Sequence, residues 1–535
     1  MLRNNSVWNS RPLDVHRWSE FPSVNDFVSL LWDRYILDND LSVPSNRGRS
    51  SNQSPKNQFK VLLLDLYVCW TEDPDKYIGI SLGNKHWKPT SRYNSLHLSK
   101  KIKLFLVWLV SKGLVEHRPH WHSLESSVNN RSSRYRASDS LIQIFKCVGF
   151  CSHDIGVYEG RETVILKAVV ESADLDDDQK SVPIEYEDTD YTRHIRSQLS
   201  KYNALLNETH VDIATLEEPI VKFVIRRGNR KGQSTTLQIN QSNKFVRRIF
   251  SRGSWECHGR IYGGWWQQVS SDIRSRIFIN GNPTVEVDFK AMHISLLNAQ
   301  TGAAVVYDPY KVSSDVFPEV DRGTVRSWNK SLVLAAINAK DRKSAYGAFR
   351  KNAPTGSAEK RLKDLQLSRL LDAFIANNPH LTEFVCSDQG IKLMNKDSHI
   401  AADIIGTLTA KKIPVLTIHD SFIVERHHFA ELRLAMIEAS LKHCRRNLIA
   451  EQDGFTVDFS DGLNMHWSVI NEQAVNKLPT HHPCPQYLDR LKRFCDAAGV
   501  VQVKNNKGRG LMARYVISLR RIIEKCTNAD TKHVS

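Results

Sequence analysis

The chain has 535 residues, of which 41% are hydrophobic and 25% charged, with a formal net charge of +16. This composition is normal for a globular protein, and the length predicts two to four domains. Because no run of about eighteen apolar residues and no apolar signal core is found, we expect a cytoplasmic protein without a membrane partner. The nine cysteines are expected to be reduced thiols, and the positive charge favours a polyanionic partner.

Residues 1–56 are expected to form an N-terminal helix and a linker rich in Ser, Asn, Arg and Pro. Residues 57–155 then combine two predicted helices, a glycine that ends the second helix, and two strands joined by a polar tip. These elements are expected at 61–69, 96–110, Gly113, 114–121 and 132–137. The order of helix, glycine stop and basic two-stranded wing resembles a winged-helix DNA-binding domain.

The resemblance to a winged-helix domain implies that basic side chains of the wing contact DNA phosphates. The candidate residues are Arg118, Arg131, Arg134 and Arg136. The same pattern also fits a small α/β accessory domain with a solvated basic hairpin, and the sequence leaves this alternative open.

The rest of the chain divides by composition into three segments. Residues 156–215 contain an acidic linker, followed by a predicted helix at 191–206 that is a candidate thumb. Residues 216–471 alternate between predicted strands and helices, and residues 472–535 form a basic tail with one helical run at 511–526.

The first segment with a chemical signature is residues 284–289, in which apolar and acidic residues alternate. Alternation of this kind predicts a strand with Glu286 and Asp288 on one face. A helix is predicted directly after it, at 291–299. A carboxylate at the end of a strand and just before a helix is well placed to hold a metal ion in a cleft.

The second segment is residues 414–424, where two short apolar runs flank a tight turn made by His419, Asp420 and Ser421. The pattern predicts a β-hairpin with an acidic tip. A buried hairpin with an aspartate at its tip needs a partner for that charge, and a divalent cation is one such partner.

The third segment is a predicted helix at 322–338. Arg326 and Lys330 are four residues apart, so they lie on one face of this helix. No acidic neighbour is evident on that face, and two cations there are suited to binding a triphosphate.

Together the three segments contain what phosphoryl transfer requires. Asp288 and Asp420 are the candidate catalytic carboxylates and would hold two divalent ions, with Phe289 as a further candidate metal ligand. Magnesium is the expected ion because the ligands are hard oxygens. Lys330 and Arg326 would neutralise the charge that develops on the phosphates.

The three segments resemble motifs A, B and C of family A DNA polymerases and single-subunit RNA polymerases, in the correct order and over roughly residues 245–470. The resemblance implies a right-hand polymerase of α+β class, with palm, fingers and a short thumb. Upstream, His258-Gly259-Arg260 resembles a segment of the family whose arginine touches the primer–template. The resemblance also implies that His419 lies near the primer terminus.

Two nucleotide-binding positions depart from the family pattern. His293 stands at the site in motif A that senses the sugar, where its bulk would exclude a 2′-hydroxyl and favour deoxynucleotides. Asn338 stands where motif B has a tyrosine, so the usual stacking support beside the base pair is missing.

The function predicted from these residues is template-directed DNA synthesis by a polymerase of a mobile element. Its expected partners are a DNA template and primer and nucleoside triphosphates. A single-subunit RNA polymerase or primase is one alternative, supported by Ser421 in motif C. A replication initiator that binds DNA without catalysis is another. An HD-type phosphohydrolase is disfavoured, because that chemistry needs further His and Asp ligands on helices, whereas His419-Asp420 is predicted to lie in an apolar hairpin.

Overall fold

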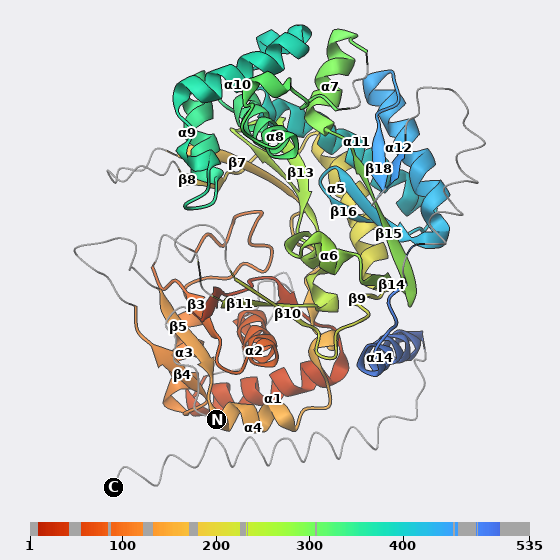
Figure 1. Cartoon of the computed structure of the whole chain (residues 1–535). Helices are drawn as coiled ribbons and strands as arrows, with labels where there is room; N and C mark the ends of the chain where they lie inside the picture. The colour runs from red at the N-terminus through yellow and green to blue at the C-terminus, as the bar shows by residue number, and fades with distance from the viewer. Residues whose placement is uncertain are drawn as a thin grey trace. The chain divides into compact units, whose positions relative to one another are not determined.

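Figure 1 shows the computed structural model of the chain, in which helices and sheets together form a mixed α+β protein, as predicted. The structure describes residues 9–41, 55–83, 87–120, 132–170, 180–224, 232, 234–304, 308–452, 455–457, 478 and 480–502. None of the helices within these ranges combines the length and apolar character that a membrane span requires. The cysteines within them are all free thiols.

The chain forms two compact units. The first contains the described residues within 1–162, 210–245 and 483–502, and the second those within 163–209 and 246–482. Each unit therefore combines stretches that are far apart in the sequence, and this division differs from the five consecutive segments expected.

The first unit is built on a core between helices. Its helical elements are α1 (Pro22–Asp38), α2 (Pro55–Glu72), α3 (Ile102–Ser111), α4 (Asp139–Lys146), η4 (Ser152–Asp154), η5 (Gln241–Lys244) and α14 (Pro485–Gln502). Phe27 and Leu31 of α1 and Phe59 and Leu63 of α2 are fully buried in one hydrophobic cluster. The N-terminal helix was expected to lie apart from the following block, but its apolar face is part of the same core.

The strands of the first unit, apart from β9, form one mixed sheet and two pairs. They are β1 (Ser10–Pro12), β2 (Arg17–Trp18), β3 (Tyr77–Ile80), β4 (Val115–Arg118), β5 (Ser133–Ala137), β6 (Gly156–Val157), β9 (Val211–Ile213), β10 (Ile220–Val224) and β11 (Ser234–Gln238). The sheet has the order β1-β3-β5-β4, and β2 pairs with β6 and β10 with β11. The predicted hairpin is confirmed, because β4 and β5 are antiparallel with Val115 opposite Ala137.

The helix before this hairpin is shorter than predicted but ends where predicted. It begins at Ile102, because His97 has a left-handed backbone (φ 51°) that a helix cannot continue through. At the other end, Gly113 has φ 64° and donates its N–H to the Val110 carbonyl, while the Leu114 N–H bonds the Leu109 carbonyl at 2.9 Å. These two bonds form a glycine-dependent helix stop.

The prediction of an exposed basic wing is wrong for two of its arginines. The predicted phosphate contacts are Arg118, Arg131, Arg134 and Arg136, of which Arg131 lies outside the described residues. Arg134 and Arg136 are only 6% and 5% exposed. The reason is that β3 pairs with the second edge of β5, which makes β5 an interior strand. Arg136 is engaged by Glu116 at 2.7 Å, and half-buried Arg118 lies over the Tyr77 ring.

The second unit contains two sheets. Their strands are β7 (Val164–Val170), β8 (Lys180–Pro183), β12 (Arg247–Ser251), β13 (Ser254–Tyr262), β14 (Ile277–Ile279), β15 (Asn282–Phe289), β16 (Leu416–Ile418), β17 (Ser421–Glu425), β18 (Ala450–Gln452) and β19 (Phe455–Val457). One sheet has the order β13-β12-β7-β8, and the other contains β16-β17-β15-β14, with β18 paired to β15 and β19. Part of the predicted acidic linker, residues 180–183, is therefore a sheet strand.

Helices of the second unit pack on these sheets and on one another (Figure 1). They are α5 (Asp190–Glu208), η6 (Trp265–Gln268), α6 (Ser271–Arg274), α7 (Met292–Thr301), η7 (Ser314–Val316), α8 (Arg322–Asn338), α9 (Arg342–Asn352), η8 (Glu359–Arg361), α10 (Asp364–Asn377), η9 (Pro379–Phe384), α11 (Gly390–Ala410), η10 (Arg426–His428) and α12 (Phe429–Cys444). The helices predicted at 191–206, 291–299 and 322–338 are confirmed. The helical run predicted at 511–526 lies outside the described residues.

Helix α11 lies directly against β13, and a glycine makes this contact close. Gly259 has φ +86°, and a Cβ placed there would lie 2.8 Å from Ser398 Oγ and 2.9 Å from the Phe250 ring. The Gly259 carbonyl accepts a hydrogen bond of 2.8 Å from Arg248 Nε, and Arg248 Nη2 donates to Ser398 Oγ. This close approach brings α11 next to the residue that follows, Arg260.

Replacing Gly259 by alanine tests this contact. We expect Gly259→Ala to lower the free energy of unfolding of the second unit by about 3 kcal/mol, from left-handed backbone strain plus overpacking. Gly302→Ala is the matched control, since Gly302 has φ +72° but no atom within 4 Å of an added Cβ. The control should cost only about 1 kcal/mol in urea denaturation. Equal losses for the two variants would contradict the close-packing explanation.

Candidate functional site

Asp288 and Asp420 come together because β15 and β17 are neighbours in one sheet. The two strands are antiparallel, with Asp288 directly opposite Ser421, the residue after Asp420. The Phe289 N–H also donates to the Asp420 carbonyl at 3.1 Å. Since opposite residues in an antiparallel pair lie about 5 Å apart at Cα, the main chains of Asp288 and Asp420 are next to one another at the end of the strand pair.

The two acids have different surroundings. Asp288 is exposed, whereas Asp420 is partly buried in the turn between β16 and β17. Burial raises the pKa of Asp420; the charge of Asp397 also raises it, and Arg260 and His293 act in the opposite direction. A divalent cation beside Asp420 would favour its ionised form, so the pair of acids fits a hard metal ion.

The neighbouring acid Glu286 is engaged elsewhere. Its two carboxylate oxygens accept 2.9 Å bonds from Arg274 Nε and Nη2, and Ser421 Oγ donates to Oε1 at 2.5 Å. These bonds orient β15 against β17 and commit Glu286 to an ion pair with Arg274. Phe289 has a buried side chain packed edge-on against Phe422 and offers only its main-chain carbonyl oxygen.

A cluster of alternating charges adjoins Asp420. Arg260 on β13 is bound by Asp397 of α11, with Nε at 3.1 and 3.0 Å from the two carboxylate oxygens. His293, at the start of α7, is 8% exposed, and its Nε2 lies 3.3 Å from Arg260 Nη2 and 3.5 Å from Asp397 Oδ2. The carboxylate of Asp397 therefore balances the positive charge of Arg260, and the carboxylate of Asp420 remains available for a different cation.

His419 precedes Asp420 in the hairpin turn and has a left-handed backbone with φ 61°. Burial lowers the pKa of His419 to about 4, with the charges of Arg260 and His258 in the same direction and Asp397 opposing them. Its ring is edge-on to Tyr262 at 5.2 Å. At neutral pH His419 is consequently an uncharged imidazole packed beside the acids.

Helix α8 carries the two predicted phosphate-binding cations, and one of them has an acidic partner. Arg326 Nε donates to Asp308 Oδ2 at 2.6 Å, which corrects the expectation that this helix face has no acidic neighbour. The partner was missed because it comes from the segment before the helix. Lys330 is exposed and forms no ion pair with any residue in the described ranges.

Tyr310 links the α8 face to the acids. Burial raises the pKa of this tyrosine; the charges of Asp308 and Asp420 raise it too, and Arg326 lowers it. Tyr310 thus lies within electrostatic range of both Asp420 and Arg326. The Tyr310 carbonyl also accepts a 2.8 Å bond from Asn329 Nδ2 of α8, which holds this segment against the helix.

Asn338, the remaining predicted nucleotide-binding residue, directs its side chain to groups of its own helix and of the neighbouring helix α11. Its Nδ2 donates to the Leu334 carbonyl at 2.7 Å, within α8. Its Oδ1 packs against Gly390 at the start of α11, where a Cβ would lie 1.9 Å away. In this arrangement the side chain supports the junction of two helices.

Asp397 and Tyr310 were missed by the reading of the sequence. A signal for Asp397 was present, because Leu393, Asp397, Ile400 and Ile404 recur at helical spacing and place an acid on an apolar face.

A comparison of the chain with models of known protein families and with curated protein sequences finds no match. The roles of these residues therefore rest on their chemistry and geometry.

The Arg260–Asp397 pair can be tested against an exposed pair of the same chemistry. We expect Asp397→Asn to lower the free energy of unfolding by about 3–5 kcal/mol, because it leaves Arg260 without its buried partner. Asp388→Asn, in the exposed pair with Arg252, should cost less than about 1 kcal/mol. The side chains of Asp397 and Asp388 are 1% and 37% exposed. A small loss for Asp397→Asn in chemical denaturation would contradict the assignment.

Proposed function

We propose that the chain is a template-directed nucleotidyltransferase, a DNA polymerase of a mobile element that extends a 3′-hydroxyl. The observation that carries the proposal is the pairing of β15 with β17, which makes Asp288 and Asp420 neighbours. Two carboxylates at adjacent strand ends, with a cationic helix nearby, are the groups that phosphoryl transfer needs.

The donor set fits magnesium, since the ligands would be the carboxylates of Asp288 and Asp420 and the main-chain oxygen of Phe289. Two Mg²⁺ ions bound there would activate the attacking 3′-hydroxyl and stabilise the leaving pyrophosphate. Asp288 is exposed towards solvent and accessible to substrate, while partly buried Asp420 is held by the sheet.

Lys330 would bind the triphosphate directly because it has no competing anion among the described residues. Arg326 would first have to exchange Asp308 for a phosphate. Since this pair is exposed, the exchange costs little. Arg260, held by Asp397, would face the primer–template, and His419 would lie beside the primer end as a neutral ring.

The finer architecture belongs to the same proposal. The sheet containing β15 and β17 would be the palm of a right-hand polymerase, α8 and α11 would belong to the fingers, and α5 to the thumb. In the first unit, α3 followed by the β4–β5 hairpin and the sheet order β3-β5-β4 support a winged-helix-like domain. The buried Arg134 and Arg136 are no part of its DNA contacts.

A primer-extension assay with Mg²⁺, using DNA and RNA templates, tests the activity. We expect Asp288→Asn and Asp420→Asn each to lower the extension rate about a thousandfold, equivalent to about 4 kcal/mol of lost transition-state stabilisation. Asp388→Asn, an exposed acid of the second unit, is the control and should extend normally. Normal DNA-dependent function of both catalytic variants would instead favour the non-catalytic initiator.

The alternative of an RNA polymerase or primase gains support from the position of His293. Its ring is packed against Arg260 and Asp397, so it is less free to block a 2′-hydroxyl than the sequence suggested. If His293 still excludes ribonucleotides by overlap, His293→Gly should raise ribonucleotide incorporation relative to deoxynucleotide incorporation about tenfold or more, or about 1.4 kcal/mol. Preferential use of ribonucleotides by the wild-type protein would favour the alternative.

A further inference from the structure

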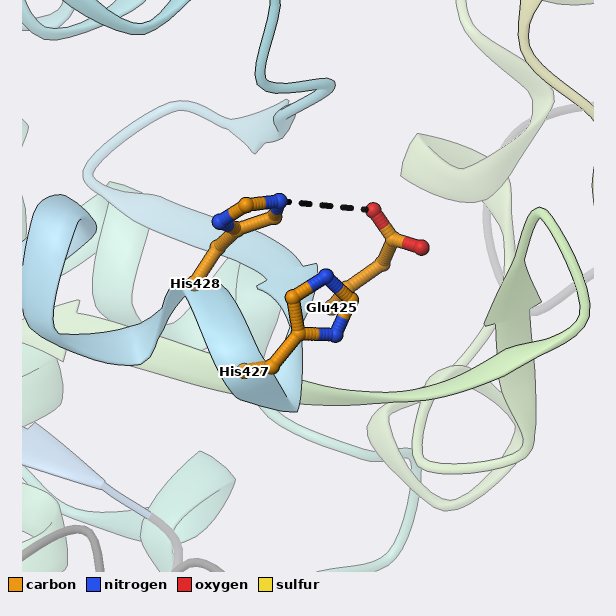
Figure 2. A group of neighbouring side chains, drawn as sticks. All are labelled: Glu425, His427 and His428. Atoms are coloured by element: carbon orange, nitrogen blue, oxygen red, sulfur yellow. Dashed lines mark ion pairs between the residues drawn. The ribbon is translucent and has the colours of Figure 1, made fainter.

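A second group of metal-binding side chains lies at the turn between β17 and α12. Glu425 is the last residue of β17, and His427 and His428 belong to η10, which leads into α12. Each residue offers one ligand atom, and these atoms all lie within 4.8 Å of one another. Figure 2 shows the two imidazoles and the carboxyl group gathered at this turn, with a dashed line from His428 to Glu425.

Glu425 is a buried carboxyl group with no strong cation beside it. It is 4% exposed, and neither lysine nor arginine within the described ranges forms an ion pair with it. Its Oε1 accepts a 2.7 Å bond from Asn282 Nδ2, which is neutral, and its Oε2 lies 4.0 Å from His428 Nε2. Because a buried carboxylate is costly without a close cation, Oε2, whose imidazole partner is 4.0 Å away, marks a place where a metal ion would stabilise the fold.

His428 has the surroundings of a metal-bound histidine. Its Nε2 faces Glu425, whereas its Nδ1 is buried without a hydrogen bond and lies 3.6 Å from Glu431 Oε1. A ligating histidine usually directs its second ring nitrogen to a carboxylate, which fixes the ring and raises its basicity. Asn282 orients Glu425 in the same way, so two of the ligands are each held by an outer partner.

His427 completes the set from the solvent side. It is exposed, and its ring centroid lies 4.2 Å from that of His428. In a tetrahedral zinc site with bonds of about 2.1 Å, neighbouring ligand atoms are about 3.4 Å apart. The Glu425 and His428 ligand atoms, 4.0 Å apart, would have to approach by about 0.6 Å to reach this spacing, and the exposed His427 ring would turn towards them.

We propose that Glu425, His427 and His428 bind one Zn²⁺ ion, with the remaining coordination position open to water. Two imidazoles and one carboxylate suit zinc and disfavour magnesium, which prefers oxygen ligands. The site is distinct from the two acids of the proposed polymerase centre. Glu425 pairs with Thr284 while Ser421 pairs with Asp288, four residues along the strands, which is roughly 13 Å. The proposal therefore stands independently of the proposed function.

Zinc binding to the full chain, stripped of metal with a chelator, tests the site by isothermal titration calorimetry. We expect one Zn²⁺ per chain for the wild type. Glu425→Gln and His428→Asn should each weaken binding by more than tenfold, and Glu431→Gln by about tenfold, as for an outer partner of a ligand. His194→Ala is the matched control, since His194 is an exposed histidine on α5 that belongs to no group of three or more potential ligands among the described residues, and should bind zinc as the wild type does.

Cobalt substitution gives a second readout that does not depend on the affinity. Co²⁺ added to the metal-free chain should produce the absorption bands of a four-coordinate site, and these should be lost in His427→Ala and His428→Asn. Far-UV circular dichroism shows whether each variant is folded. Failure of the wild type to bind zinc, or unchanged zinc binding by folded Glu425→Gln and His428→Asn, would overturn the proposal. Loss of polymerase activity would not, because these residues lie outside that centre.

Discussion

The antiparallel pairing of β15 with β17 is the contact on which the candidate site depends. It places Asp288 opposite Ser421, and the Phe289 N–H against the Asp420 carbonyl. Side chains alternate across a sheet, so a slip of one residue in this pairing would turn Asp288 away from the face that carries Ser421. Glu286 lies on the same face of β15 as Asp288, and the hydrogen bonds that it accepts from Arg274 and Ser421 stabilise this register.

Charge compensation around Asp420 is the second constraint. Arg260 is close enough to influence the Asp420 carboxyl group, but its hydrogen bonds go to Asp397. Had Arg260 paired with Asp420, the acid would have been neutralised by the protein and unavailable to a metal ion. The contact of α11 with β13 at Gly259 makes this division of partners possible, because it brings a buried acid from a distant helix to Arg260.

The first unit shows that the position of a strand in its sheet decides whether its charged side chains are exposed or buried. The arginines of residues 133–137 were predicted to contact DNA phosphates, which would require an exposed hairpin. Pairing of β3 with β5 puts this strand inside the sheet, where Arg136 is compensated by Glu116 and lies over Tyr77. In the second unit, by contrast, the Arg326–Asp308 ion pair is exposed to solvent, so replacing Asp308 by another anion would cost little free energy.

Local pattern in the sequence by itself determined the elements that carry the candidate site. The alternation at 284–289, the apolar arms around His419-Asp420-Ser421 and the spacing of 322–338 each predict a strand, a hairpin or a helix that the structure contains. These features depend on neighbours within a few residues, so the local sequence pattern is enough to predict them. Only the tertiary structure decided the partners of those elements. Asp397 reaching Arg260, Asp308 reaching Arg326 and Asn282 reaching Glu425 depend on contacts between segments that are distant in the sequence. The sequence pattern shows the periodicity of each element but does not identify which distant side chain it will meet.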